Sequence, residues 1–546
     1  MRHRGQERKK TVTSGAGFTL YFVRRPAKTG KNRRGSQTTA AFALLGKGSD
    51  MDLDAKWVPM KWPCGPLEIA RRSRSIRFNP GLKDTLEAWA QPSALDFLKG
   101  APVNCLVVDW ANGKPEDAAQ QQALQPLLEA GRRLGISFVG RVAVKEGAGP
   151  AVAAARTAGL SAVLLRHASG ETLDLPAILQ LPRDQVVGET VSSIFCIGGN
   201  AWPGVNLETM AGDNARAGAT ANPWVNSNAW VSLLAGAFEP GKTLWLDFDP
   251  PDSSSLLRPA RYGLAVADSR AYGSRWIVSL DDTLRAALPK GDSQAKGVWA
   301  ALCEALAFFE SHKEWQAFQS EGTLAVFSDF RGDNAYFSGE VLNLLNRRQV
   351  QLQIVERSRP LPAPDQELKA VLWLDKDAPS AAQLSQFLAF VRQGGLLIAA
   401  AYWGPPEVKP TKGEPTLHYD LYNLGTGQIA VAEEGFQAPD QVAVDAHLLL
   451  SRRNDIVRLY NRATVNCHSS IDPAHKRRLV QVLNYSVKPA DSVTLWVNDD
   501  VKSARLWQPG TNEAVTVQGV AASPGTEFRL PPLSLYCALE FEGATL

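Results

Sequence analysis

The chain has 546 residues, of which 45% are apolar and 21% are charged; this is the composition of a globular protein with enough apolar material for several cores. These values exclude disorder as the main state, a collagen-like repeat and a small disulfide scaffold. The first 50 residues hold 12 Lys and Arg against 2 Asp and Glu, so the basic formal charge of +4 comes from them and the remainder is mildly acidic. Nothing in that remainder predicts nucleic-acid binding.

Residues 1–50 are predicted to be a disordered basic leader, or the result of a start codon assigned too early, with Met51 as the true start. The alternative is an export signal, because Arg33 and Arg34 precede a short apolar run over 39–45. A third interpretation is that these basic residues form an arm that binds nucleic acid. We expect a cytoplasmic protein, with export to the periplasm or medium as the alternative.

The six cysteines are far apart and show no Cys or His spacing typical of zinc sites. Most lie inside apolar segments, so we expect buried free thiols. The seven histidines are scattered, and neither they nor the cysteines predict a metal or another cofactor. No apolar run approaches the ~18–20 residues that a membrane span needs, so no membrane association is predicted.

Residues 51–318 are predicted to form a TIM-like (β/α)8 barrel, in which the segment 51–100 packs as an N-terminal cap. From residue 101, short apolar runs alternate with amphipathic helices in seven or eight β/α units. The predicted strands are 106–110, 137–144, 162–165, 186–189, 194–197, 243–247 and 276–280. The predicted helices are 116–134, 150–158, 223–237, 259–272 and 294–316. An open doubly wound sheet is the alternative, but no glycine-rich phosphate loop follows the first strand.

Two smaller domains are predicted to follow the barrel. Residues 319–420 alternate strands and helices, which predicts a small doubly wound α/β domain, and residues 421–546 contain only short strands separated by turns, which predicts a β-sandwich. Amidotransferase-like domains carry a nucleophilic Cys at a tight turn after a strand. The corresponding segment 373–377 reads Trp-Leu-Asp-Lys-Asp, without Cys, Ser or flanking Gly. We therefore expect a structural role or an assembly surface for this domain.

Several predicted barrel strands end in acidic residues, where a barrel places its working side chains. Asp247 and Asp249 lie on the same face of their strand as Trp245, because side chains alternate along a strand. Two carboxyl groups on either side of a sugar are what glycoside hydrolysis requires. The candidate catalytic residues are Glu189, Asp249 and Asp247. The alternative is that each acid caps the helix after its strand.

Two loops rich in Trp and Asn, at 198–204 and 222–228, suit carbohydrate, because indole faces stack on sugar rings and amides bond hydroxyls. The candidate substrate-binding residues are Asp109, Trp110, Asn200, Trp202, Trp224, Asn226, Asn228 and Asp281. Ordinary turn and cap chemistry is the alternative for these loops.

Four segments carry a resemblance to a known family. They are Tyr262–Asp268 with Ala271-Tyr272-Gly273, Phe327-Ser328-Asp329 with Glu340–Leu345, Phe390–Leu397, and Leu483-Asn484-Tyr485-Ser486. With the predicted domain order, they resemble glycoside-hydrolase-like relatives of the beta-galactosidases that carry a trimerisation-type, amidotransferase-like middle domain. The resemblance implies a barrel-mouth site for an oligosaccharide or glycoside. It leaves homo-oligomerisation through the middle domain open.

The chain departs from this family at the expected catalytic positions. The family has an Asn-Glu pair at the end of the fourth strand and a second Glu at the end of the seventh, whereas Glu189 follows Gly188 and the later strand offers Asp247 and Asp249. We therefore carry two hypotheses, a glycoside hydrolase that uses a carboxylate pair and a non-catalytic carbohydrate-binding or assembly protein on the same scaffold.

Overall fold

The computed structural model describes residues 53, 56–74, 80–144, 147–167, 173–185, 192–206, 224–251, 255–362, 368–412, 417–460, 464–472, 474, 476–511 and 513–543. All of them belong to one compact unit, Leu44–Leu546. The predicted leader (1–50) and the predicted strand 186–189 lie outside the described residues.

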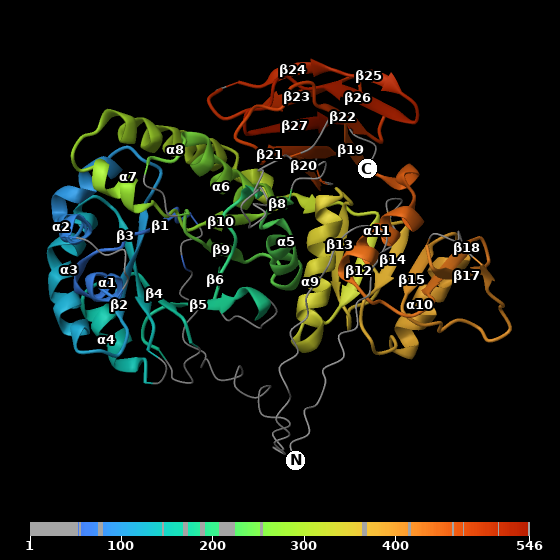
Figure 1. The fold of residues 1–546 in the computed structure, drawn as a ribbon, viewed down its shortest axis with the longest axis horizontal. Coiled ribbons are helices and arrows are strands. Elements are labelled where there is room, and N and C mark those ends of the chain that lie inside the picture. The colour runs from blue at the N-terminus through green and yellow to red at the C-terminus, as the bar shows by residue number, and fades with distance from the viewer. Residues whose placement is uncertain are drawn as a thin grey trace, which may run out of the picture. The chain divides into compact units, whose positions relative to one another are not determined.

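An eight-stranded parallel sheet forms the barrel, in the order β1-β2-β3-β4-β5-β6-β9-β10 (Figure 1). Its strands are β1 (Pro59–Lys61), β2 (Cys105–Ala111), β3 (Ser137–Val142), β4 (Ala162–Leu165), β5 (Ala177–Pro182), β6 (Ile194–Gly198), β9 (Thr243–Asp247) and β10 (Ser274–Trp276). A parallel bridge between Met60 and Val278 joins the two edge strands. Two backbone hydrogen bonds support this bridge, from Lys61 N to Val278 O at 2.8 Å and from Val278 N to Pro59 O at 2.9 Å. The predicted barrel is confirmed.

The segment 51–100 differs from the predicted cap, because it supplies the first barrel strand. The three residues of β1 are too few to show the alternation that marks a strand. The rest of the segment forms α1 (Gly65–Arg72), α2 (Pro80–Ala88) and a 3-10 helix at Pro92–Leu98. Trp57 packs inside the barrel and Trp62 outside it.

The helical layer is irregular. Its remaining helices are α3 (Glu116–Arg133), α4 (Gly149–Thr157), α5 (Ala229–Phe238), α6 (Pro259–Ala271), α7 (Asp282–Ala287) and α8 (Ser293–Ser311), and a 3-10 helix follows at Lys313–Ala317. Within the described residues, no α-helix connects β4 to β5, and only the 3-10 turn Arg183–Gln185 lies between β5 and β6.

The predicted helix 223–237 is wrong at its start. Trp224–Asn226 is strand β8, which pairs with β7 (Gly204–Asn206) in an antiparallel hairpin. Helix α5 begins only at Ala229. An aromatic and a β-branched residue favour the strand, and the apolar run that follows made the whole segment look helical.

The middle domain is a seven-stranded sheet with helices on both faces. Its order is β13-β12-β14-β15-β18-β17-β16, and the first five strands are parallel. The strands are β12 (Leu324–Ser328), β13 (Leu352–Glu356), β14 (Ala370–Trp373), β15 (Leu396–Ala399), β16 (Thr411–Lys412), β17 (Tyr419–Leu424) and β18 (Gly427–Ala432). This order is that of a doubly wound fold of the 2-1-3-4-5 type.

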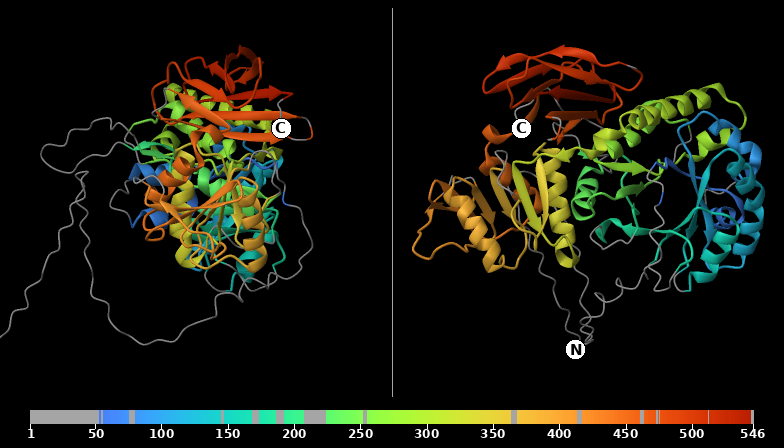
Figure 2. Two further views of the ribbon diagram at one scale, coloured as in Figure 1. Left: turned by 90° about the vertical axis from the view of Figure 1, so that its right-hand side faces the viewer. Right: turned by 180° about the vertical axis from the view of Figure 1, so that it is seen from behind.

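Helix α10 (Ala381–Arg392) covers one face of this sheet, and α9 (Gly332–Arg347) with α11 (Pro439–Leu450) covers the other (Figure 2). The sheet continues past the predicted boundary at residue 420, which falls inside β17. The antiparallel β17–β18 hairpin looks like sandwich sequence, because nothing in its pattern shows that β18 pairs with β15.

The C-terminal domain is the predicted β-sandwich. One sheet has the order β11-β20-β21-β27-β23-β24 and the other β19-β22-β26-β25. The strands are β11 (Gln319–Ser320), β19 (Val457–Tyr460), β20 (Val465–Asp472), β21 (Arg477–Asn484), β22 (Thr494–Val497), β23 (Ser503–Trp507), β24 (Val515–Gln518), β25 (Val520–Ala522), β26 (Gly525–Arg529) and β27 (Tyr536–Glu542). An apolar core that includes Val480, Leu495 and Phe528 lies between the sheets.

All six cysteines are free, and five are buried, as expected; Cys303 is half-buried. Among the helices that the structure describes, none is both long and apolar enough to cross a bilayer.

Candidate functional site at the barrel mouth

The interior of the barrel has an apolar floor and a polar layer above it. The floor is made by inward side chains such as Val107, Val139 and Trp245. Side chains alternate along a strand, so the residue two positions after each floor residue also points into the barrel. At these positions the residues are polar, except for one glycine. This polar layer consists of Lys61, Asp109, Arg141, Arg166, Gln180, Gly198, Asp247 and Ser279. Because parallel strands end at the same edge, the layer gathers at the carboxyl-terminal mouth of the barrel.

A cavity of about 1300 Å³ opens over the polar layer, and all eight of its residues line the cavity. Further charged residues reach it from α1 and from the segment after β10, among them Glu68, Arg71 and Asp282. A cavity of this size holds a small oligosaccharide.

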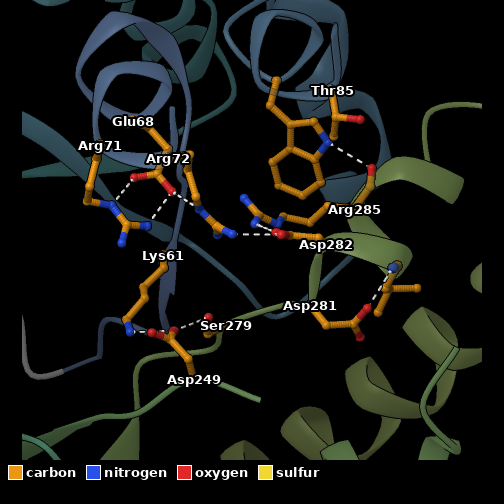
Figure 3. Close-up of polar contacts among 12 residues, drawn as sticks. Lys61, Glu68, Arg71, Arg72, Thr85, Asp249, Ser279, Asp281, Asp282 and Arg285 are labelled. Atoms are coloured by element: carbon orange, nitrogen blue, oxygen red, sulfur yellow. Dashed lines mark hydrogen bonds and ion pairs between the residues drawn. The ribbon is translucent and has the colours of Figure 1, made fainter. Parts of the chain in front are cut away.

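Lys61 links the two acids at the end of β9. Its ammonium forms an ion pair with Asp247 and a second one with Asp249 at 2.6 Å. The Ser279 hydroxyl donates to the same oxygen of Asp249 at 2.6 Å (Figure 3). The Asp247 side chain is 11% exposed and that of Asp249 68%, so Asp249 is the acid that a ligand in the cavity reaches first.

These contacts decide the protonation state of Asp249. Burial alone would raise the pKa of its carboxyl, but the charge and hydrogen bond of Lys61, together with the Ser279 hydroxyl, outweigh it and bring the pKa to about 2. Asp249 is therefore ionised at neutral pH and has no proton to donate. An ionised carboxylate suits a nucleophile or a general base.

The second oxygen of Asp247 accepts a hydrogen bond from the Gln180 amide at 2.6 Å. Gln180 is on β5 and Asp247 on β9, so the amide reaches across β6 between them. It can do so because Gly198 of β6 has no side chain: a Cβ there would lie 2.8 Å from Gln180 Nε2. The glycine therefore keeps the path from Gln180 to Asp247 open.

Asp109 is held by a cation in the same way. Arg141, its neighbour on β3, donates from Nε to Asp109 Oδ1 at 2.6 Å. Burial would raise the pKa of Asp109, but the charge and hydrogen bond of Arg141 together with the charges of Arg71 and Arg166 outweigh it, and the pKa is lowered. Its other oxygen, Oδ2, is buried and accepts no hydrogen bond from the described residues.

A network of ion pairs borders the cavity on the side of α1. The fully buried Glu68 pairs with Arg71 and Arg72, each at 2.6–2.8 Å. Arg72 continues to Asp282 at 2.7 Å, and Asp282 also pairs with Arg285 (Figure 3). The network fixes α1 to the segment after β10, and all of these acids are bound to cations.

Five of the predicted site residues line this one cavity: Asp109, Asn200, Asp247, Asp249 and Asp281. Asp281 also caps α7, because its Oδ1 accepts the Leu284 N–H at 3.0 Å, and its Oδ2 accepts the Tyr262 hydroxyl. The helix-cap alternative therefore holds for this acid. Glu189 lies outside the described residues.

Two predicted substrate-binding tryptophans lie elsewhere in the barrel. Trp110 points away from the cavity and donates to the Ala151 carbonyl of α4 at 2.9 Å. Trp202 packs edge-on against the rings of Phe248, Tyr262 and Trp276. Neither ring lines the cavity.

The predicted residues of the second loop also lie away from the cavity. Trp224 is stacked under the Arg347 guanidinium, 3.7 Å from its ring centre, and its indole N–H donates to Asn226. Asn228 is fully buried and donates to Asp268 and to the Ala201 carbonyl. These contacts hold Trp224, Asn226 and Asn228 against other segments of the protein, so we do not assign them to substrate binding.

Sequence reasoning missed five polar members of the layer: Lys61, Arg141, Arg166, Gln180 and Ser279. Strand alternation could have found four of them, because Arg141, Arg166, Gln180 and Ser279 each follow a buried inward residue by two positions. Lys61 had no comparable signal. Within the described part of the chain, no group of three His, Cys, Asp or Glu side chains is placed to hold a metal ion.

Comparison with solved structures gives the fold an independent reference. Alpha-L-fucosidase isoenzyme 2 from Paenibacillus thiaminolyticus aligns with a TM-score of 0.54 and 10% sequence identity, over 89% of this chain and 99% of that one. Exo-beta-1,4-mannosidase Op5Man5 from Opitutaceae bacterium strain TAV5 aligns with a TM-score of 0.43 and 12% identity, over 71% of this chain and 93% of that one. No protein-family profile and no curated protein matches the sequence. At such identities the fucosidase likeness concerns the fold alone, and the chain has a fold that glycoside hydrolases share.

Proposed function

We propose that the protein hydrolyses a glycosidic bond in the cavity at the barrel mouth. The observation that carries this proposal is the pair of acids Asp247 and Asp249, which line the cavity and share Lys61. The ionised side chain of Asp249 is 68% exposed, so a ligand in the cavity can reach it. Asp109, Gln180 and Asn200 of the same lining offer donors and acceptors for sugar hydroxyls.

In the proposed reaction, Asp249 or Asp247 acts as the ionised carboxylate. It either attacks the anomeric carbon or takes a proton from the attacking water. The low pKa of Asp249, about 2, suits this role and excludes that of proton donor. The bond from the anomeric carbon to the leaving oxygen breaks, and that oxygen receives a proton from a second carboxyl group.

We assign the proton donor to Glu189, which follows β5 in the chain, as the sequence predicts. Asp109 and Asp249 are poor proton donors, because neighbouring cations lower the pKa of both carboxyl groups. Asp109 and Asn200, which line the cavity, would bind substrate hydroxyls.

The second candidate function is carbohydrate binding without hydrolysis. The pairing of Asp109 with Arg141, and of Asp247 and Asp249 with Lys61, favours it, because paired acids can serve as fixed hydrogen-bond acceptors. In that case Asp109, Asp247 and Asp249 accept hydrogen bonds from the sugar, but no carboxyl group donates a proton to the leaving oxygen.

For the middle domain we propose an amidotransferase-like origin and a role in structure or assembly. Its Asp375, after β14, accepts hydrogen bonds from Ser328 and Asn334 at 2.9 Å and pairs with Arg357 at 3.3 Å. A carboxylate held in this way ties two strand ends together and leaves no nucleophile at the turn.

Turnover of a panel of aryl glycosides by the full-length protein tests the proposal. Glu189→Gln, Asp249→Asn and Asp247→Asn are each expected to reduce kcat by about 10²-fold or more. Asp96→Asn is the matched control, because the Asp96 side chain is 67% exposed, like that of Asp249, and pairs with Lys99 away from the cavity. Unchanged turnover in all three variants would remove the site assignment. Binding of sugars without turnover in the wild type would establish the second candidate.

A further inference from the structure

Cationic side chains outnumber acidic ones around the barrel-mouth cavity. Among the described residues that line it, nine are cations: Lys61, Arg71, Arg72, Arg74, Lys114, Arg141, Arg166, Arg183 and Arg285. Seven are acids: Glu68, Asp109, Glu116, Asp247, Asp249, Asp281 and Asp282. The remainder of the chain beyond the leader is mildly acidic, so this excess belongs to the cavity and not to the body of the protein.

Within the described part of the chain, Arg166 is the cation of the polar layer that forms no ion pair with a carboxylate. It follows β4 directly and its backbone N–H bonds to the Val142 carbonyl at 3.1 Å, which places it at the mouth beside the end of β3. Arg141 on β3 is paired with Asp109, and Lys61 is paired with Asp247 and Asp249. Among the residues that the structure describes, no acid lies within ion-pair distance of Arg166.

Arg141 and Arg71 add positive charge near Arg166 and Asp109. Asp109 feels the charges of Arg141, Arg71 and Arg166, in that order of strength. One carboxylate is therefore paired with Arg141 and attracted by two more guanidinium groups. Of these, Arg71 already shares Glu68 with Arg72. Burial and repulsion from Arg141 lower the pKa of Arg166 more than the attraction of Asp247 and Asp109 raises it. An anionic group in the cavity would add to that attraction and stabilise the cation.

We propose that the sugar bound in this cavity carries a negatively charged group, which pairs with Arg166 beside Arg141. This inference rests on the proposed function for the presence of a sugar and adds its chemical class. A guanidinium binds a planar carboxylate through two parallel hydrogen bonds, and it also binds sulfate and phosphate. The polar side chains of Asp109, Gln180 and Asn200, which line the same cavity, would bind the hydroxyls of this sugar.

Isothermal titration calorimetry on the full chain tests the proposal without requiring turnover. The probes are the methyl glycosides of glucuronic and galacturonic acid, their neutral counterparts methyl glucoside and methyl galactoside, and the 6-sulfated and 6-phosphorylated sugars. We expect at least one acidic sugar to bind about tenfold or more tightly than its neutral counterpart. Comparing the carboxylated, sulfated and phosphorylated sugars identifies which anionic group the cavity binds.

Arg166→Gln is expected to weaken binding of the preferred acidic sugar about 10- to 100-fold, which removes most of the preference over the neutral one. Arg166→Lys, which keeps the charge but loses the paired donors, should fall between Arg166→Gln and the wild type. Arg156→Gln is the control, because Arg156 is an exposed arginine of α4 outside the cavity. Circular dichroism of each variant confirms folding.

Three outcomes would overturn the proposal: equal binding of acidic and neutral sugars, no binding of any acidic sugar, or a preference that Arg166→Gln leaves unchanged. The proposed hydrolysis fails separately. If acidic sugars bind through Arg166 and no aryl glycoside is turned over, the anionic ligand class stands and the catalytic assignment does not.

Discussion

Two groups of carboxylates in this protein are stabilised in opposite ways. At the barrel mouth, Asp109 and Asp249 face Arg141 and Lys61, and both carboxyl groups have lowered pKa values. Where the barrel meets the sandwich, Asp268 of α6 is fully buried among neutral donors, and burial raises its pKa.

The contacts of Asp268 bring together three parts of the chain. It accepts hydrogen bonds from the Ser227 hydroxyl at 2.7 Å, from the Asn228 backbone at 3.0 Å and from the Tyr485 hydroxyl of the sandwich at 2.7 Å. The comparison shows what each environment favours. A neighbouring cation stabilises the ionised form of a carboxyl group, which can then act on a ligand. A carboxyl group surrounded by neutral donors accepts hydrogen bonds from several segments and so connects them.

The largest effect on stability is expected at Asp268. Replacing it with Ala leaves several buried donors without an acceptor, so the free energy of unfolding should fall by about 3 kcal/mol or more. Denaturant unfolding with Asp268→Ala, Asp268→Asn and Tyr485→Phe measures this loss. Tyr485→Phe removes one donor and should cost only about 1 kcal/mol. A loss for Asp268→Ala no larger than for Tyr485→Phe would contradict the assigned role.

The pH dependence of the Asp268→Asn variant tests the same environment. Because the folded pKa of Asp268 lies above its unfolded value, the native state keeps a proton that the unfolded chain has lost, and this contribution to stability declines as pH rises above about 4. The amide of the Asp268→Asn variant does not titrate, so this pH-dependent contribution is missing from the variant. The stability difference between wild type and variant should therefore narrow with rising pH, by at most ~1.4 kcal/mol for each pKa unit of the shift.

At the barrel mouth, Lys61→Met tests the opposite case. Without the shared ammonium, the pKa of Asp249 should rise from about 2 to its ordinary range near 4 or above, because two carboxylates then face each other unpaired. The acid limb of the kcat/KM profile should move up by about two pH units. Lys99→Met, which breaks an exposed pair with Asp96, is the control. An unmoved acid limb would show that Lys61 does not set the charge of Asp249.

The smallest effect is expected at Gly198. Alanine there places a Cβ against the Gln180 amide and should break its hydrogen bond to Asp247, at a cost of about 1–2 kcal/mol in stability. Gly236→Ala in α5 is the matched control, because no atom lies within 4 Å of the added Cβ, and it should be neutral or stabilising. Thermal unfolding of both variants compares them. Equal melting temperatures would mean that Gln180 can move aside freely.

Much of the fold follows from local patterns. Apolar runs that alternate with amphipathic helices predicted the barrel and the doubly wound domain, and short strands without helices predicted the sandwich. The same alternation placed Asp247 and Asp249 on the Trp245 face, and the structure has all three side chains on the interior side of β9. Errors arose where an element is too short for a pattern, as in β1, or where only the partner strand defines it, as in β8 and β18.

The candidate site was predictable only in part. The acids at the ends of β2 and β9 were found, since a charged residue after a buried strand is visible in the sequence. The tryptophans were wrongly expected beside them as lining residues, because a Trp that fills a core and a Trp that faces a ligand look alike in the sequence. Trp110 and Trp202 fill cores.

The sequence by itself determined most of the strands and helices, and which side chains of the predicted strands face the interior of the barrel, because both depend on residues two to four positions apart. Only the tertiary structure decided the charge of each acid. Lys61 and Asp249 are 188 residues apart, and Gln180 and Asp247 are 67 apart. No local pattern records such partners. Gln180 meets Asp247 only across β6 in the assembled sheet, and Lys61 meets the acids at the end of β9 only when β1 and β10 close the barrel.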